Sequence, residues 1–406
     1  MSNVLSNKKI VLGVTGSIAA YKAADLSSKL VQQGALVDII LTRSATEFIT
    51  ATTFNAITHR PVITGLFTGA GQRNIEHIHL ANEADMIVVA PATANVIAKL
   101  ALGIADDPLT VTALATTAPM VIAPAMDGHM FEHPAVQENI RTLRNRDVHI
   151  AGPGQGRMAS GLVGIGRLIE PSEILGHIRW KMGQSGDLAG KVIVISAGGT
   201  QEPIDPVRII TNRSSGKMGY ALAEAARDRG AHVILVSAPT NLPAPIGMTT
   251  HNVETVTEMR SFILETCQNA DALIMAAAVS DYSPIEAATN KLKKDPNKDS
   301  LTLDLLINSD FFNEIPPHVL RIGFAAETEN LIANAKKKLV DKGLALIVAN
   351  DVTKPESGFN VDTNQVTLIH PQGGYEELPL LPKTMVSHKI LDRVAVLLTE
   401  QDKLDG

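Results

Sequence analysis

The sequence predicts an α/β protein with two Rossmann-like domains built on mainly parallel sheets. An order of strand, glycine turn, helix and strand occurs in residues 8–41 and again in residues 191–236. Strands that alternate with helices at this spacing are typical of parallel sheets with crossover helices. The small, glycine-rich segment 183–190 lies between the two repeats and indicates a linker. We therefore expect one domain over residues 1–186 and a second over residues 187–406.

Apolar runs and turn residues place the elements of each repeat. In the first, strands are expected at 8–14 and 35–41, with a helix at 18–33 between them. In the second, a helix at 217–229 follows the first strand and its glycine turn. Other expected elements are strands at 86–90, 120–123, 149–151, 191–195, 232–236, 272–276, 321–325 and 344–349, a helix at 331–342, a hairpin at 365–378 and a closing helix at 383–399.

Composition excludes several classes of function. A net charge of −6 and an aromatic content of 3% do not suit a nucleic-acid-binding protein. Cys267 is the only cysteine, so neither an intrachain disulfide nor a multi-thiolate metal site is expected. The sequence contains no recognisable signal peptide and no apolar run of membrane-spanning length. These features favour a cytoplasmic protein without a membrane partner.

The connection 196–219 carries the strongest indication of a ligand site. Gly198 and Gly199 follow a strand and allow the backbone to approach a ligand closely. The same connection contains an amide and three cations, which are Asn212, Arg208, Arg213 and Lys217. Residues 212–215 are expected to cap the helix that follows. The combination predicts a site for an anionic phosphate compound, and the alternative is an ordinary connection with solvated cations.

The first domain has polar loops at three expected strand ends. Its first turn lacks the GxGxxG spacing, and strand 35–41 is followed by Thr42 instead of an acidic residue, which argues against NAD. Polar side chains at the carboxyl edge of such a sheet are placed to bind a ligand. The residues concerned are Gly16, Ser17, Thr42, Pro91, Thr93 and Asn95. Together they favour a small phosphorylated ligand, although each loop alone is compatible with helix capping.

Several motifs of the first half resemble the flavin-dependent cysteine decarboxylase family. They are GVTGSIAAYK at 13–22, HIHL at 77–80, PATANV at 91–96, GIADD at 103–107 and PAMD at 124–127. Over residues 8–400 the chain resembles the bifunctional phosphopantothenoylcysteine decarboxylase/phosphopantothenate–cysteine ligases of coenzyme A biosynthesis. The resemblance implies a flavodoxin-like domain. The residues implied to bind FMN are Gly16, Ser17, Thr42, Pro91, Thr93 and Asn95. It also implies that His77 is an active-site histidine and that the flavin oxidises the substrate thiol so that CO2 can leave.

Two residues depart from the family pattern. Asp127 stands where the family usually has an asparagine, and an ionised carboxylate cannot donate a hydrogen bond to the substrate carboxylate. Ser160 stands where the family has a cysteine that donates a proton, and a hydroxyl is a much weaker acid than a thiol. Three outcomes remain open. Decarboxylation proceeds with altered roles, it stops at an oxidised product, or the domain only binds flavin as a scaffold.

The second half resembles the ligase. The resemblance implies that Gly198, Gly199, Arg208 and Lys217 bind 4′-phosphopantothenate, and that Asn212 handles the acyl intermediate. It implies that Lys291 lies on a flexible lid over the triphosphate of CTP. The other residues implied for CTP are Asp281, Ser309, Asp310, Phe311, Phe312, Phe324, Lys338 and Lys342, and the family commonly has proline in place of Ser309.

The implied reaction sequence uses small-molecule substrates only. CTP with Mg2+ activates the carboxylate of 4′-phosphopantothenate as an acyl-cytidylate, cysteine attacks, and decarboxylation gives 4′-phosphopantetheine. The protein ligands of the metal stay unknown. The resemblance also implies a homo-oligomer that combines trimeric flavin domains with dimeric ligase domains. The alternatives are a ligase with a silent flavin scaffold, a flavin electron carrier and a nicotinamide-dependent reductase.

Overall fold

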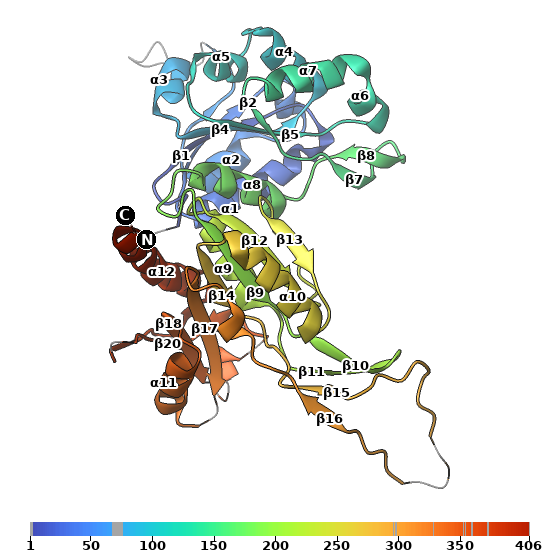
Figure 1. Ribbon diagram of the computed structural model, residues 1–406. Coiled ribbons are helices and arrows are strands. Elements are labelled where there is room, and N and C mark those ends of the chain that lie inside the picture. Colours follow the sequence, from blue (N-terminus) through green and yellow to red (C-terminus); the bar gives the residue numbers. More distant parts are fainter. Residues whose placement is uncertain are drawn as a thin grey trace. The chain divides into compact units, whose positions relative to one another are not determined.

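The computed structural model describes residues 3–66, 76–294, 296, 299–327, 329–351, 353, 355–358, 360–371 and 373–405. The chain divides into two compact units, Ser2–Met182 and Gly183–Gly406, with Met1 grouped with the second. Each unit contains a central sheet with helices on both faces (Figure 1). The expected α/β fold with mainly parallel sheets is confirmed.

The first unit has a six-stranded parallel sheet in the order β3-β2-β1-β4-β5-β6. Its strands are β1 Lys9–Val14, β2 Leu36–Leu41, β3 Val62–Ile63, β4 Met86–Ala92, β5 Met120–Pro124 and β6 His149–Ile150, and a separate ribbon pairs β7 Gly154–Arg157 with β8 Val163–Arg167. Its helices are α1 Tyr21–Gln32, α2 Ala51–Thr58, α3 Glu76–Glu83, α4 Ala94–Leu102, α5 Pro108–Ala115, α6 Gly128–Glu132, α7 Pro134–Arg144 and α8 Pro171–Gly183.

Two apolar cores lie on the two faces of this sheet. Leu26 of α1 and Ile178 of α8 pack with one set of strand residues, and Ile97 of α4 and Ile140 of α7 pack with the other set. Because both faces are covered, the central strands are continuous apolar runs instead of alternating ones, as in β4, where every residue is buried. This is why the strands of this domain could be recognised from the sequence.

The second unit has an eight-stranded sheet in the order β13-β12-β9-β14-β17-β18-β20-β21, in which only the last two pairings are antiparallel. Its strands are β9 Val192–Ala197, β12 His232–Ser237, β13 Thr249–Asn252, β14 Ala272–Met275, β17 Leu320–Glu327, β18 Leu346–Asp351, β20 Val366–Ile369 and β21 Tyr375–Glu377. Its helices are α9 Lys217–Arg227, α10 Val256–Thr266, α11 Leu331–Asp341 and α12 Lys383–Asp405. Helices α9 and α12 share one core, whereas α10 and α11 belong to another.

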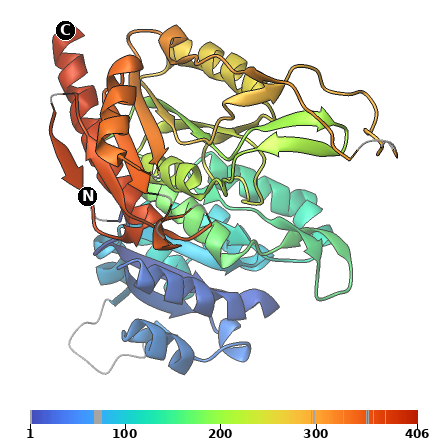
Figure 2. The ribbon, with the colours of Figure 1, turned by 90° about the horizontal axis from the view of Figure 1, so that it is seen from below.

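Two antiparallel ribbons in this unit were not expected from the sequence. They pair β10 Gln201–Asp205 with β11 Arg208–Thr211, and β15 Tyr282–Pro284 with β16 Leu305–Ile307, and a short pair joins β19 Thr363–Asn364 to β22 Leu381–Pro382. The first two ribbons lie side by side, and both views show the connection between β15 and β16 extending as a long arm (Figures 1 and 2). These strands are short, and β11 and β16 are largely exposed, so burial imposes no apolar period by which they could be recognised.

The segment 183–190 is packed, although its composition suggests an open linker. A Cβ atom at Gly183 or Gly186 would collide with the backbone at the end of α9. Arg229, which is 4% exposed, donates from Nε to Asp187 Oδ1 over 2.8 Å, and Leu188 is buried. Glycine is therefore used here for close backbone approach instead of flexibility.

Candidate active sites

In the first unit, the polar residues expected to bind a ligand lie where β1, β2 and β4 end. The ends of parallel strands meet at one edge of the sheet, so Ser17, Thr42 and Thr93 share that edge. Ser17 accepts a hydrogen bond from Ala19 N over 3.3 Å, and Thr93 accepts one from Val96 N over 3.5 Å. Both hydroxyls therefore cap helices, and each keeps its proton to donate to a ligand.

Thr15, which the sequence analysis did not single out, fastens two of these loops together. Its buried hydroxyl donates to Pro91 O over 2.8 Å and accepts from Thr93 N over 3.1 Å. Asn95 lies exposed in the first turn of α4, after the same loop. In the sequence, the one feature that could have pointed to Thr15 is its position directly after a buried strand.

The carboxyl edge of this sheet has two features that suit a polar ligand. Thr42 is 7% exposed, and its hydroxyl has no hydrogen-bond partner within the described chain. A buried hydroxyl without a partner costs free energy on the order of 1–3 kcal/mol, which a ligand acceptor or donor would recover. Gly16 lies so close to Ser44 that a Cβ atom would collide with it. The backbone at Gly16 is therefore bare, as a close approach to a ligand requires.

The structure brings together the two residues that depart from the family pattern. Ser160 Oγ donates to Asp127 Oδ2 over 2.7 Å, although 33 residues separate them. Asp127 also caps α6 by accepting from His129 N over 3.2 Å. The Ser160 hydroxyl, and then the His129 N–H, lower the pKa of Asp127. Asp127 is consequently an ionised, acceptor-only group near neutral pH, and it holds the hydroxyl proton of Ser160.

Glycine allows the ribbon that carries Ser160 to reach the end of β5. Gly166 has φ of 136° and lies so close to Met126 O that a Cβ atom would collide with it. Its carbonyl accepts from Met126 N over 3.0 Å. The turn at Ser160 is closed by a bond from Met158 N to Leu162 O over 2.8 Å. These contacts hold Ser160 over the residue that follows Met126, which is Asp127.

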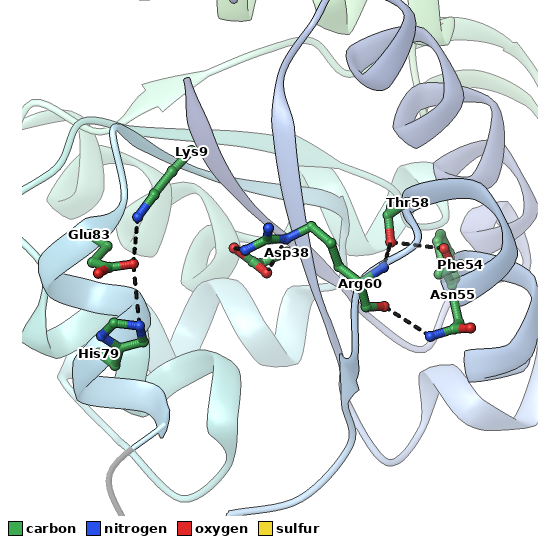
Figure 3. Close-up of polar contacts among 8 residues, drawn as sticks. All are labelled: Lys9, Asp38, Phe54, Asn55, Thr58, Arg60, His79 and Glu83. Atoms are coloured by element: carbon green, nitrogen blue, oxygen red, sulfur yellow. Dashed lines mark hydrogen bonds and ion pairs between the residues drawn. The ribbon is translucent and has the colours of Figure 1, made fainter. Parts of the chain in front are cut away.

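His77 and His79 have different surroundings on α3. Glu83 joins His79 Nε2 over 3.3 Å and Lys9 Nζ over 2.6 Å, which ties the helix to β1 (Figure 3). His79 therefore has a structural role, whereas His77 is half-buried at the start of the helix. Within the described residues, His77 makes no hydrogen bond with Asp127 or Ser160. The segment 67–75 before α3 lies outside those residues.

The same close-up shows how the chain that follows α2 is fixed to the sheet. Arg60 donates from Nε to Asp38 Oδ1 over 2.7 Å and from Nη2 to Oδ2 over 3.0 Å (Figure 3). Asp38 belongs to β2 and is 8% exposed, and this ion pair is the first cause of a raised pKa of Arg60. A bidentate pair of this kind is geometrically specific, so it fixes the chain after α2 against the sheet.

In the second unit, a cleft of about 610 Å³ collects most of the residues expected to bind the substrates. Those that line it are Asn212, Lys217, Asp281, Ser309, Asp310, Phe311, Phe312, Phe324, Lys338 and Lys342. Asn212 follows β11, Lys217 begins α9 and Asp281 follows β14. Residues 309–312 follow β16, Phe324 lies within β17, and Lys338 and Lys342 lie on and directly after α11. A concave site with several convergent polar groups is typical of a small-molecule site.

Four expected residues do not line this cleft. Gly198, with φ of 80°, and Gly199 pack closely against the carbonyls of Ala238 and Asn212, so their role is backbone packing. Arg208 pairs with Asp205 over 3.0 Å and donates to Leu292 O over 3.1 Å. Arg208 therefore holds the arm on which Lys291 lies exposed.

Two amides clamp the loop between β14 and β15. Asn212 Nδ2 donates to Val279 O over 3.0 Å, and Asn308 Nδ2 donates to Ser280 O over 2.9 Å. Asn308 N also donates to Asp281 O over 2.9 Å. Residues 212–215 do not cap α9 as expected, because its N-cap is Gly216 with φ of 73°, and Asn212 is used for this clamp instead.

Two lysines of the cleft, Lys338 and Lys342, are engaged by carboxylates. Lys342 Nζ lies 2.7 Å from Asp310 Oδ2 and 5.0 Å from the ring centroid of Phe312, and Lys338 Nζ lies 2.7 Å from Glu327 Oε1. These lysines are 32% and 44% exposed respectively, so solvent screens both pairs and an incoming phosphate can compete. Phe312 and its neighbour Phe311 are also part of the apolar core, which fixes this wall of the cleft.

Three residues of the cleft were missed by the sequence analysis. Asn308 lies in the INSDFF motif, but its clamp on another loop had no local signal. Ser280 has a buried hydroxyl without a hydrogen-bond partner among the described residues. Lys383 begins α12, is 6% exposed and lines the cleft. Only the tertiary structure separates Lys383 from the many lysines on helix surfaces.

Other features of the described residues limit the chemistry. No group of three or more His, Cys, Asp or Glu side chains there is arranged to hold a metal ion. Burial raises the pKa of the Cys267 thiol to about 12. Cys267 is a buried residue in an apolar core of the second unit, so its thiol is not available to replace the family cysteine at the position of Ser160. Among the described residues, no helix combines the length and the apolar character that crossing a membrane requires.

Comparison with protein families divides the chain into two matches. The family described as Flavoprotein matches residues 1–183, and the family described as DNA/pantothenate metabolism flavoprotein C-terminal domain matches residues 188–397. The coenzyme A biosynthesis bifunctional protein CoaBC of Bacillus subtilis (strain 168) is 46% identical over 400 residues, which are 97% of this chain and 98% of that protein. The protein of that name from Escherichia coli (strain K12) is 40% identical over 406 residues, which are 98% and 99% of the two chains.

Solved structures resemble the two halves separately. The C-terminal domain of a coenzyme A biosynthesis bifunctional protein CoaBC is 41% identical with a TM-score of 0.46, and the match covers 53% of this chain and 100% of that chain. The FMN-dependent cysteine decarboxylase SpaF is 32% identical with a TM-score of 0.36, and the match covers 40% of this chain and 91% of that chain.

The family matches and the full-length relatives agree with the resemblance found in the sequence motifs. They confirm the expectation of a bifunctional enzyme with a flavoprotein segment. The chain belongs to the family of bifunctional coenzyme A biosynthesis proteins.

Proposed function

We propose that this chain ligates cysteine to 4′-phosphopantothenate with CTP and then decarboxylates the product to 4′-phosphopantetheine with FMN. The cleft of the second unit carries the ligase part of the proposal, because it gathers an amide, an acid and several cations from distant connections. The first unit supports the decarboxylase part through its carboxyl edge and the Asp127–Ser160 pair. We assign residues 1–186 to decarboxylation and residues 187–406 to ligation.

In the ligase part, the residues of the cleft have separate tasks. Lys217 is positioned to attract the phosphate of 4′-phosphopantothenate, while Lys338 and Lys342 are positioned to exchange their carboxylate partners for the triphosphate of CTP. We propose that Asp281, which lines the cleft, holds Mg2+ together with the phosphates, since Mg2+ is usually bound by one or two carboxylates and substrate oxygens. No dedicated protein cage is then needed.

The proposed role of Asn212 needs no movement, whereas that of Lys291 does. The amide of Asn212 already holds the carbonyl of Val279, so the intermediate would meet an amide whose orientation is fixed. Lys291 lies on the arm beyond the cleft, and it would reach the triphosphate only if the arm closes. Arg208 and Asp205, which both bond the backbone of Leu292, provide the fixed base for such a closure.

In the decarboxylase part, the residues at the carboxyl edge fit a flavin mononucleotide. Ser17, Thr42 and Thr93 offer hydroxyl donors to its phosphate and ribityl oxygens, and Gly16 permits close approach. FMN, when bound, supplies the two-electron oxidation of the substrate thiol that allows CO2 to leave. Mg2+, CTP and FMN are the cofactors and co-substrate of this proposal.

Asp127 and Ser160 together replace the family's asparagine and cysteine. The ionised carboxylate can accept a proton, and the hydroxyl that it holds is a proton donor on the flap, which is the ribbon of β7 and β8 with the turn at Ser160. His77 is the third group proposed for proton transfer. We further propose the family assembly of trimeric flavin domains and dimeric ligase domains.

The test is mass spectrometry of the products formed by purified, flavin-loaded protein from 4′-phosphopantothenate, cysteine, CTP and Mg2+. The expected product is 4′-phosphopantetheine. Accumulation of 4′-phosphopantothenoylcysteine would overturn the decarboxylase part and indicate a ligase with a silent flavin domain. One observation favours this alternative, a ligase with a silent flavin domain. Ser160 already donates its proton in a hydrogen bond to Asp127. An oxidised, unreduced product would show that Ser160 does not replace the family cysteine.

A further inference from the structure

Lys383 is a buried cation in the wall of the ligase cleft that the proposed reaction does not use. It is the first residue of α12, and its ammonium donates to the carbonyl of Gly358 over 3.3 Å and to the carbonyl of Val361. Its backbone N–H donates to Asp362 O over 2.8 Å. One residue thus holds three carbonyls of the described part of segment 355–364, which we name the wall loop.

The wall loop is held from a second helix by Lys217. Lys217 is the first residue of α9, and its Nζ donates to Asn360 O over 2.9 Å and to Asp362 Oδ1 over 2.7 Å. Helices α9 and α12 pack against each other in one apolar core, so their first residues lie on the same side of the cleft. The wall loop therefore connects a buried lysine to the lysine assigned to 4′-phosphopantothenate.

The two lysines differ in what they can do. Lys217 is 32% exposed, and its partner Asp362 is 89% exposed, so an incoming phosphate can displace that carboxylate. Lys383 is 6% exposed and bonds backbone carbonyls that cannot leave without moving the loop. A buried charge of this kind is tolerated because its donors are satisfied.

We propose that Lys383 is a positioning residue of the ligase, which holds the wall loop so that Lys217 points into the 4′-phosphopantothenate subsite. This inference rests on the proposed ligase function. It predicts that loss of the Lys383 charge weakens binding of 4′-phosphopantothenate and leaves the binding of CTP nearly unchanged, because Lys338 lies on another helix, α11, and Lys342 directly follows that helix.

The charge of Lys383 gives the proposal a second readout. Burial, and then the charge of Lys217, lower the pKa of Lys383 to about 8, while Asp362 raises it. The ammonium form is therefore present below about pH 8 and is lost as the pH rises through that value. The Michaelis constant for 4′-phosphopantothenate should increase over the same range. Among the described residues, the charged groups that shift the pKa of Lys383 are Lys217 from α9 and Asp362 from the wall loop.

The experiment measures pyrophosphate release from CTP without cysteine in single turnovers, so that the amine of cysteine does not contribute to the pH profile. Lys383→Met should raise the half-saturating concentration of 4′-phosphopantothenate by ~10-fold and that of CTP by less than ~2-fold. The matched control is Lys389→Met, an exposed lysine on the same helix that does not line the cleft, and it should behave as the wild type. Circular dichroism of each variant shows whether it is folded.

Two further variants keep the test decisive if Lys383→Met does not fold. Asp362→Asn changes only an exposed side chain, and it should move the alkaline loss of binding to lower pH, because Asp362 raises the pKa of Lys383. Lys383→Arg stays charged and should remove the loss between about pH 7 and about pH 9.5. An alkaline profile that neither variant changes would overturn the inference. A wild-type protein that releases no pyrophosphate would instead overturn the proposed ligase function.

Discussion

The two candidate sites of this chain are assembled in different ways. At the carboxyl edge of the first unit, Ser17, Thr42 and Thr93 each follow the strand that places them, and two of them cap the next helix. In the cleft of the second unit, Asn212 and Asn308 act on a loop that lies between them in the sequence. The first site is thus a set of local connections at one sheet edge, whereas the second depends on contacts among distant segments.

This difference determines how each site should respond to mutation. A residue that acts within its own loop can be replaced with a local effect, whereas a residue that clamps a distant loop affects several substrates together. The Asp127–Ser160 pair lies between these extremes, because a flap from β7 and β8 brings Ser160 to the end of β5. The following predictions separate the cases in order of decreasing effect.

Asn212→Asp should produce the largest loss. The new carboxylate cannot donate to Val279 O, and it would place a negative charge beside the phosphates of both substrates. We expect ligation to fall by ~10²–10³-fold while the flavin absorbance is retained. The measurement is the rate of 4′-phosphopantothenoylcysteine formation, with the flavin spectrum as control. A wild-type ligation rate would remove Asn212 from the site.

Ser160→Ala should lower decarboxylation by about 10²-fold, since it removes the proposed proton donor. It should also raise the pKa of Asp127, because the Ser160 hydroxyl is the main cause of its lowered value. Asp127 is charged above its folded pKa, so any acid loss of activity should move to higher pH in the variant. The readout is the pH profile of CO2 release from 4′-phosphopantothenoylcysteine. An unchanged rate would mean that Ser160 is not the donor.

Gly166→Ala should destabilise the first unit by about 1–3 kcal/mol, because its backbone conformation is strained for a residue with a side chain and a Cβ would collide with Met126 O. Gly164→Ala on the same strand is the matched control, because its added Cβ would only touch Met158. Thermal unfolding followed by flavin fluorescence compares the two variants. Equal melting temperatures would contradict the account of how the flap approaches β5.

Cys267 should have the smallest effect on activity. Burial raises the pKa of its thiol to about 12, so almost no thiolate exists near neutral pH. We expect slow labelling of the native protein by a thiol reagent, fast labelling after denaturation, and normal decarboxylation in Cys267→Ala. Rapid labelling of the native protein together with loss of decarboxylation would show that this thiol, instead of Ser160, serves the flavin domain.

Most of the sheet could be predicted because the central strands are buried on both faces and appear as continuous apolar runs. The ribbons β10–β11 and β15–β16 could not, because their residues are largely exposed and no core imposes a period on them. The segment 183–190 was misjudged for a different reason, because glycine is typical of flexible linkers and equally of close packing, which is its use here against α9.

The sequence by itself determined the fold class and the family, and it pointed to ten of the residues that line the cleft of the second unit. These properties follow from local patterns, since a strand end, a glycine turn and a helix start are neighbours in the chain. The tertiary structure decided which side chains meet. Ser160 reaches Asp127, Asn308 clamps the loop at Ser280, and Lys383 meets the loop that holds Lys217. Such contacts join residues far apart in sequence, so they depend on how the elements pack and leave no local signal.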